Sequence, residues 1–236
     1  MALLALCRER PALGRSARAQ AAIGRGIALA LPPNVSAPRL LRGLLSPDEC
    51  AALLAAAVAH GEAHGWGSLH RKYPTVDLPV AKLRGGGAVV SALQERAFPA
   101  FGRFFGEAYG PADALVMRDC FVAKYEAGGQ SGLAGHVDAS LLSLVMTLSP
   151  PGEFEGGGTH FEHAGRTLSP PQGDAVLFLG KVFHEGRPIT RGTRFVLVAL
   201  VDKRGTVAPP PPRPDEAAAG EAADSAEAAD SVEGRG

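Results

Sequence analysis

From Ala114 to Asp202 the chain alternates short strand-like runs with breaks that contain Gly and Pro, and this pattern limits the possible folds more than any other. Short runs rich in β-branched and aromatic residues and bounded by turn residues are typical of strands. The pattern predicts strands near Leu115–Glu126, His136–Leu148, Thr159–His163, Gly165–Leu168, Ala175–Gly180 and Thr193–Asp202.

A helix is expected upstream, over Ser46–His60. Ser46 suits the N-cap, Pro47 suits the first helical position, and Glu49 completes a capping box with Ser46. The residues that follow are good helix formers, and Gly61 is expected to end the helix.

A second helix is expected from about Val90 to Tyr109, after a chain break at Gly85–Gly87 and with a kink at Pro99. Its apolar stripe favours core packing and consists of Phe98, Phe101, Phe104 and Phe105. Two helices followed by many short antiparallel strands predict an α+β fold. Its expected core is a double-stranded β-helix (jelly roll), flanked by the N-terminal helices.

Between the expected helices, Gly65–Leu83 contains two prolines and is predicted to form a loop or a short edge strand. Its polar side chains either line a substrate cleft or face solvent, and the sequence leaves both alternatives open. These residues are His70, Arg71, Lys72, Tyr73 and Asp77.

Three potential metal ligands lie within the strand-rich region. His136 and Asp138 are two residues apart, and His184 follows on a later strand. Two imidazoles and one carboxylate are the ligand set of a facial-triad ferrous site, which leaves positions for a co-substrate and dioxygen. Because side chains at i and i+2 of a strand share a face, His136 and Asp138 can reach one metal. Arg194, on the strand that follows His184, can hold a carboxylate of the co-substrate.

Each element of this pattern is weak alone, because His-x-Asp pairs are common and single histidines are usually structural. His160 and His163, for example, are expected in surface or loop roles. The indication comes from the ordered set, which is Tyr125, His136, Asp138, GGGT, GDAVLF, His184, PIT and Arg194.

The motifs HVDAS, FEGGGTHF and HEGRPITRGTRFVLVALV resemble the iron(II)- and 2-oxoglutarate-dependent dioxygenases, in particular the prolyl 4-hydroxylase and lysyl hydroxylase group. The upstream segment LSPDECAALL is similar to the first helix of that family's domain. The resemblance covers roughly Leu44 to Asp202.

The resemblance also implies site roles. Arg194 matches the basic residue that pairs with the distal carboxylate of 2-oxoglutarate, whereas Arg187 and Arg191 match less well; Arg191, beside Gly192, is expected in a solvated turn. Tyr125 matches a tyrosine whose hydroxyl contacts the co-substrate, and strand alternation places it on an inward face with Phe121 and Ala123. The positions that match the iron(II) ligands are His136, Asp138 and His184.

By this resemblance the chain is expected to hydroxylate an unactivated C–H bond, of a peptidyl proline or lysine above all, with succinate and carbon dioxide as co-products. The implied cofactors are iron(II), 2-oxoglutarate, dioxygen and L-ascorbate. The apolar wall of the cavity is expected to consist of Leu142, Leu144, Met146, Phe178 and Val196.

Two alternatives remain open. The first is the same chemistry on a small molecule or a methylated nucleic acid. The formal net charge is zero and no Arg follows Arg194 before Arg204, so a nucleic-acid substrate is not expected. The second is a jelly-roll binding protein without turnover, which is disfavoured because polar ligands are costly to bury without a metal. The sequence does not indicate an oligomeric state.

Differences in composition along the chain predict three regions. Residues 1–43 are Arg-rich and expected to be poorly ordered, as an organelle transit peptide or a basic tail. Residues 44–203 form the expected dioxygenase domain. Residues 204–236 are Pro-rich, then acidic, and are expected to be disordered.

The cellular compartment is only weakly constrained. The three cysteines, Cys7, Cys50 and Cys120, are too widely spread to indicate a disulfide framework, which favours a reducing compartment. No apolar run approaches the roughly 18 residues that a membrane span needs. A soluble protein, cytoplasmic or organellar, is expected.

Overall fold

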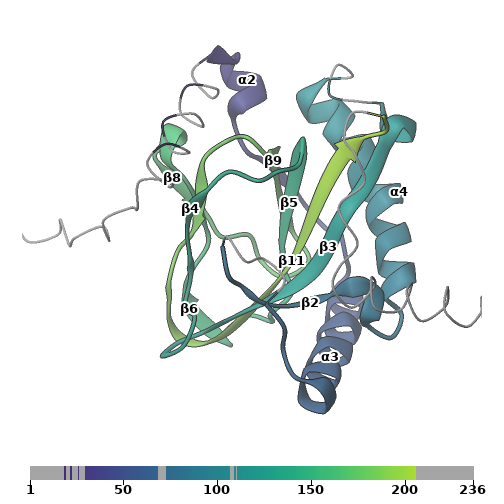
Figure 1. Cartoon of the computed structure of the whole chain (residues 1–236), viewed down its shortest axis with the longest axis vertical. Coiled ribbons are helices and arrows are strands. Elements are labelled where there is room, and N and C mark those ends of the chain that lie inside the picture. Colours follow the sequence, from purple (N-terminus) through teal and green to yellow (C-terminus); the bar gives the residue numbers. More distant parts are fainter. Residues whose placement is uncertain are drawn as a thin grey trace, which may run out of the picture. The chain divides into compact units, whose positions relative to one another are not determined.

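A computed structural model describes residues 30–68, 73–106, 109 and 111–205, together with residues 19, 22 and 26 (Figure 1). Most of the basic segment 1–43 and residues 206–236 of the expected tail lie outside the described residues. So do His70, Arg71 and Lys72 of the segment between the two expected helices.

The larger sheet has seven strands in the order β1-β9-β5-β11-β3-β2, and β6 pairs with β11 off this path (Figure 1). All its pairings are antiparallel. β11 pairs with β3, β5 and β6, so it organises the sheet. The strands are β1 (Arg39–Leu41), β2 (Val76–Pro79), β3 (Leu115–Glu126), β5 (Leu142–Thr147), β6 (Phe154–Gly156), β9 (Ala175–Leu179) and β11 (Ile189–Lys203).

The smaller sheet has four antiparallel strands in the order β4-β10-β7-β8. In its register His184 of β10 lies directly opposite His136 of β4. The sheet therefore brings together two histidines that are far apart in the sequence. Its strands are β4 (Leu133–His136), β7 (Thr159–Phe161), β8 (Arg166–Leu168) and β10 (His184–Gly186).

The predicted capping box is confirmed at the start of α3 (Pro47–His64). The backbone N–H of Glu49 donates to Ser46 Oγ at 3.2 Å, and the backbone N–H of Ser46 donates to Glu49 Oε2 at 2.7 Å. Arg96 of α4 (Gly86–Phe105) adds a 2.9 Å ion pair with Glu49. The hydrogen bond from Arg96 is the largest of the causes that lower the pKa of Glu49 to about 2.

The expected end of α3 at Gly61 is wrong. The helix continues to His64 and ends at Gly65, whose φ of 82° favours glycine. Gly61 is buried inside the helix, where a Cβ would lie 2.2 Å from Nε1 of Trp66. This glycine therefore serves packing rather than helix termination.

The expected start of the second helix is also wrong. α4 begins at Gly86, so Gly86 and Gly87 lie in its first turn and only Gly85 precedes it as the N-cap. A Cβ on Gly86 would clash with the carbonyl oxygen of Val80, which explains the glycine there. Pro99 lies within the helix, which ends at Phe105. Other helical segments among the described residues are α2 (Pro33–Ser36), η1 (Val80–Lys82), η3 (Ala112–Ala114) and η4 (Glu162–Ala164).

Strand alternation divides the interior into two clusters. Val122 and Leu197 join the large core cluster, which contains residues from α3 and α4. Their neighbours Phe121 and Val196 point the other way, into a second cluster. The predicted core role of the aromatic stripe is confirmed: Phe98, Phe101 and Phe105 are buried in the large cluster, and Phe104 packs against it.

Most predicted strands are confirmed within a few residues, and Gly65–Leu83 contains the edge strand β2. The single strand expected over His136–Leu148 is wrong, because β4 ends at His136 and β5 starts at Leu142. β11 begins at Ile189, so Arg191 lies in a strand rather than a turn. Among the described residues, no helix combines the length and apolar character that crossing a membrane requires.

The capping box gives a test of the first helix. We expect Ser46→Ala to lower the free energy of unfolding by about 1 kcal/mol, because a backbone donor loses its partner. Ser91→Ala, at an exposed position inside α4, is the control and should change stability by less than about 0.5 kcal/mol. Urea denaturation measures both variants, and equal effects would contradict the capping role.

Candidate metal centre and cavity

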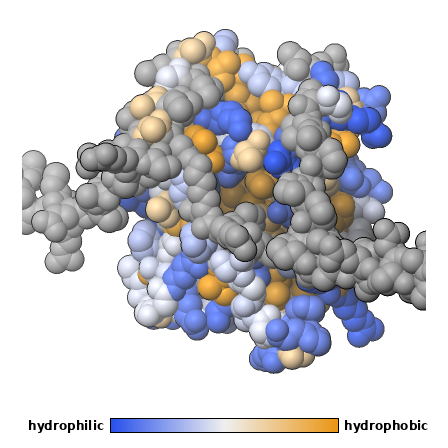
Figure 2. Space-filling view, in the orientation of Figure 1, coloured by the Kyte–Doolittle hydropathy of each residue, from blue (hydrophilic) through white to orange (hydrophobic). Residues whose placement is uncertain are grey.

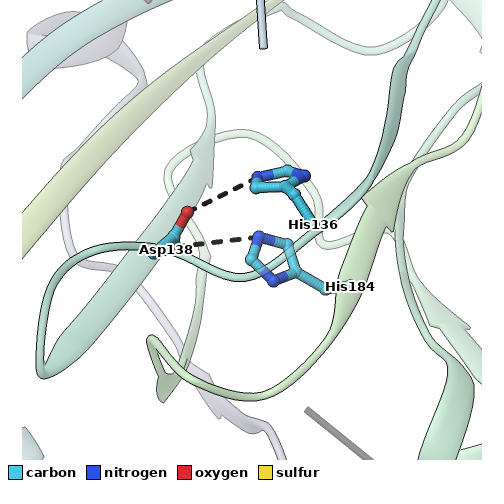
Figure 3. A group of neighbouring side chains, drawn as sticks. All are labelled: His136, Asp138 and His184. Carbon is cyan, nitrogen blue, oxygen red and sulfur yellow. Dashed lines mark ion pairs between the residues drawn. The ribbon is translucent and has the colours of Figure 1, made fainter. Parts of the chain in front are cut away.

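His136, Asp138 and His184 form a compact cluster. Their potential ligand atoms all lie within 4.8 Å of one another. His136 Nε2 is 3.4 Å from Asp138 Oδ1, and His184 Nε2 is 3.7 Å from Asp138 Oδ2. Figure 3 shows the three side chains pointing toward one another. The structure thus brings together the three residues that the sequence singled out.

The side chains of His136 and Asp138 do meet, but the expectation that they share a face of one strand is wrong. His136 is the last residue of β4, and Asp138 lies in the connection to β5, outside any strand. Asp138 is positioned instead by its backbone N–H, which donates to the carbonyl oxygen of Gly180 at 2.7 Å. The connection, rather than strand alternation, turns the carboxylate toward the histidines.

Backbone carbonyls orient both imidazoles. His136 Nδ1 lies 2.8 Å from the carbonyl oxygen of Ala134, and His184 Nδ1 lies 3.0 Å from that of Val182. A carbonyl only accepts, so each Nδ1 carries the hydrogen. Each Nε2 is then the basic nitrogen, and it faces the carboxylate. Metal-binding histidines are typically oriented in this way.

The protonation states suit a cation. Burial lowers the pKa of His184 to about 4, against the opposing charge of Asp138, so the imidazole is neutral near pH 7. Burial alone would raise the pKa of Asp138, but His184, His136 and a hydrogen bond from Ser143 hold it below its usual value. Ser143 Oγ donates to Asp138 Oδ2 at 2.5 Å. The neutral imidazole of His184, the ionised carboxylate of Asp138 and the imidazole of His136 form a donor set that fits a divalent transition metal.

The cluster lies in a cavity of about 480 Å³. In the same orientation as Figure 1, Figure 2 shows hydrophobic residues near the middle of this face, with hydrophilic residues around them. The polar lining includes Tyr125, Thr159, Lys181 and Arg194. The apolar walls are formed by Phe121, Leu133, Val145, Val196, Val198 and Leu200.

The expected cavity wall is right only for Val196. On β5 it is Val145 that lines the cavity, so the alternating neighbours Leu144 and Met146 point into the large core cluster, as does Leu142. Phe178 also belongs to that cluster, and its ring lies 4.5 Å from the His184 ring, edge to face. It supports a candidate ligand instead of lining the cavity.

Arg194 carries a buried charge that lines the cavity, with only 2% of its surface exposed. Among the described residues, its Nε and one Nη have no hydrogen-bond partner. Aromatic rings flank the guanidinium, with Cζ 5.9 Å from the Tyr125 ring centre and 5.7 Å from that of Phe154. Burial lowers the pKa of Arg194. A Cβ on Gly157 would lie 3.1 Å from Arg194 Cδ, so the glycine triplet makes room for this side chain.

Tyr125 lies directly opposite Arg194 in the β3–β11 register and also lines the cavity. The predicted inward face is confirmed, because Phe121, Ala123 and Tyr125 belong to one buried cluster. Burial raises the pKa of Tyr125, against the opposing charge of Arg194, so its hydroxyl keeps its proton near pH 7. The hydroxyl can therefore donate a hydrogen bond into the cavity.

Four other residues considered from the sequence can be placed, and none of them lines the cavity: Arg187, Arg191, His160 and His163. Arg187 pairs with Glu185 and Arg191 with Glu155, each at 3.0 Å, and Arg191 is exposed as expected. His160 Nδ1 is 3.0 Å from Thr167 Oγ1, and His163 Nε2 is 3.1 Å from the carbonyl oxygen of Ser36. These contacts agree with structural roles.

Two of the polar residues of Gly65–Leu83 can be placed. Tyr73 lines the cavity, with its ring centre 5.0 Å from that of His136. Asp77 is fully buried and accepts a hydrogen bond from Thr75, which does line the cavity. Sequence reasoning missed Ser143 and Lys181, because neither belongs to a recognisable motif and both are recognised only by their contacts.

A comparison with known proteins finds no family model that matches this chain. Over 137 residues it is 33% identical to the multifunctional procollagen lysine hydroxylase and glycosyltransferase LH3 of Rattus norvegicus, which covers 56% of this chain and 18% of that protein. It is 38% identical over 86 residues to procollagen-lysine,2-oxoglutarate 5-dioxygenase 1 of Mus musculus, which covers 35% of this chain and 12% of that protein. The chain thus spans a small part of these relatives.

Solved structures of prolyl hydroxylases also match this chain. A viral collagen prolyl hydroxylase from Paramecium Bursaria Chlorella virus-1, in complex with 2-oxoglutarate, gives a TM-score of 0.55 at 20% identity over 70% of this chain and 94% of that one. A Pseudomonas putida prolyl-4-hydroxylase gives 0.55 at 18% identity over 79% and 100%. The resemblance to the prolyl and lysyl hydroxylase group is confirmed. At these identities the solved structures show a shared fold, and the α+β prediction is consistent with it.

The cluster predicts metal binding that depends on His136. We expect the purified protein to bind one Co(II), a redox-stable substitute for iron(II). His136→Ala should weaken this affinity by more than about 100-fold, because losing a ligand exceeds the roughly 10- to 100-fold effect of an outer partner. His160→Ala is the matched control and should bind as the parent does. Calorimetric titration measures all three, and equal affinities would exclude His136 as a ligand.

Proposed function

We propose that this chain is an iron(II)- and 2-oxoglutarate-dependent dioxygenase that hydroxylates an unactivated C–H bond. The proposal rests on the buried guanidinium of Arg194, whose Nε and one Nη have no hydrogen-bond partner within the described part of the chain. This guanidinium lies in the cavity that also holds the His136, Asp138 and His184 cluster. A cation site and an anion site in one pocket suit a metal with a carboxylate-bearing co-substrate.

His136, Asp138 and His184 would hold the iron. The donor set fits, because two imidazoles and one carboxylate leave coordination positions open. When bound, the iron supplies the oxidative chemistry that couples decarboxylation of 2-oxoglutarate by dioxygen to hydroxylation of the substrate. The chain itself orients the ligands through the carbonyls of Ala134 and Val182 and the hydroxyl of Ser143.

Arg194 and Tyr125 would bind the distal carboxylate of 2-oxoglutarate. A guanidinium donates two parallel hydrogen bonds to a carboxylate, and the phenol adds a third donor. This occupancy would pair the buried charge of Arg194, which is costly alone. The apolar walls would exclude water around the reacting groups.

The substrate we propose is a peptidyl proline or lysine. Support comes from the names of the relatives, which are procollagen lysine hydroxylases, and of the structural neighbours. One neighbour is a Trichoplax adhaerens prolyl hydroxylase in complex with a hypoxia inducible factor peptide fragment, with a TM-score of 0.51 at 12% identity over 82% of this chain and 94% of that one. By the same support, the two sheets would form a double-stranded β-helix flanked by α3 and α4, and residues 44–203 the catalytic domain.

Succinate formation tests this function. The iron(II)-loaded protein, given 2-oxoglutarate, dioxygen and ascorbate as reductant, should release succinate, and either proline-rich or lysine-containing peptides should stimulate the release. Peptides in which the proline or lysine is replaced by alanine are the control. Mass spectrometry should find one added oxygen in the stimulating peptide. An iron-loaded protein that forms no succinate would contradict the dioxygenase and favour a binding role.

A further inference from the structure

Lys181 connects the two segments that carry the candidate ligands. It lies three residues before His184 and lines the cavity. Its Nζ donates to the carbonyl oxygen of Asp138 at 2.9 Å and to that of Ala139 at 3.1 Å. A side chain that lies just before His184 thus binds the backbone of the connection between β4 and β5, at Asp138 and Ala139.

This connection, residues 137–141, is not part of a strand, so no regular strand pairing holds its backbone in place. Its backbone is held by Asp138 N–H to the carbonyl of Gly180 at 2.7 Å and by Gly180 N–H to the carbonyl of Leu141 at 2.9 Å. Leu141 N–H donates to Asp202 Oδ1 at 2.8 Å. In the described part of the chain, the donor that satisfies the carbonyls of Asp138 and Ala139 is Lys181.

We propose that Lys181 is a positioning residue for the metal centre, which fixes the Asp138 carboxylate relative to His184. The proposal rests on the iron site of the proposed function. Lys181 acts through backbone carbonyls and touches none of the three ligand side chains in the contacts described above. Its role is therefore to restrict the directions in which Asp138 can point before the metal binds.

Two effects of the ammonium group oppose each other. Its hydrogen bonds hold the carboxylate in place, whereas its positive charge disfavours a nearby cation. Lys181 is exposed, so water and salt screen the charge. We therefore expect positioning to dominate, and removal of the ammonium to weaken metal binding.

The test compares Lys181→Met, which keeps an unbranched side chain one atom shorter but removes the donor, with Lys181→Arg, which keeps a donor. Lys82→Met is the control, because Lys82 is exposed and does not line the cavity. Calorimetric titration with Co(II) gives the affinity, and the Co(II) absorption spectrum reports the coordination geometry. Thermal unfolding of the metal-free variants reports the fold.

We expect Lys181→Met to weaken Co(II) binding about tenfold and to alter the Co(II) spectrum, with an unchanged melting temperature. Lys181→Arg should restore both to within about threefold of the parent, and Lys82→Met should match the parent. Equal or tighter binding by Lys181→Met would overturn the positioning role, as would a lowered melting temperature that fully accounts for the weaker binding. A parent protein that binds no Co(II) would instead contradict the iron site of the proposed function.

Discussion

The buried guanidinium of Arg194 is the constraint on which the site depends. Removing a cation from water costs several kcal/mol unless it is paired. The flanking rings of Tyr125 and Phe154 offset part of this cost, by about 2 kcal/mol for each desolvated contact. Within the residues that the structure describes, Nε and one Nη have no hydrogen-bond partner, and an anionic co-substrate would satisfy them. The strand β11 holds this charge in a cavity whose walls are otherwise largely apolar.

The two faces of β11 have different roles, one in the hydrophobic core and one in the cavity. Residues of β11 that point one way, such as Leu197, join the core with α3 and α4, whereas Arg194 and Val196 point toward the cavity. The smaller sheet then sets His184 opposite His136. Hydrogen bonds from Ser143 and Lys181 hold Asp138 between them. The candidate ligands are thus held by hydrogen bonds within the chain, which reduces the ordering that metal binding requires.

The sequence predicted residue types and their order better than their geometry. The three candidate ligands and Arg194 were found because the ordered motifs are specific, and β3 was found because its pattern is local. The predicted orientation of the β5 side chains was wrong, since a one-residue difference in register moves every side chain to the opposite face of the sheet. The strand break after His136, and the contacts of Lys181, depend on pairing between distant segments. No local pattern encodes such contacts.

The proposed role of Arg194 is to bind the distal carboxylate of 2-oxoglutarate. The most direct measurement compares 2-oxoglutarate with 2-oxopentanoate, which lacks that carboxylate, by calorimetric titration of the Co(II)-loaded protein. Truncating one partner of a buried charge pair costs about 2–5 kcal/mol, so 2-oxoglutarate should bind more than about 30-fold tighter than 2-oxopentanoate. Arg194→Met should abolish this preference, whereas Arg191→Met, on the same strand but exposed, should keep it. Equal affinities for the two ligands, or a preference that survives in Arg194→Met, would contradict this role of Arg194.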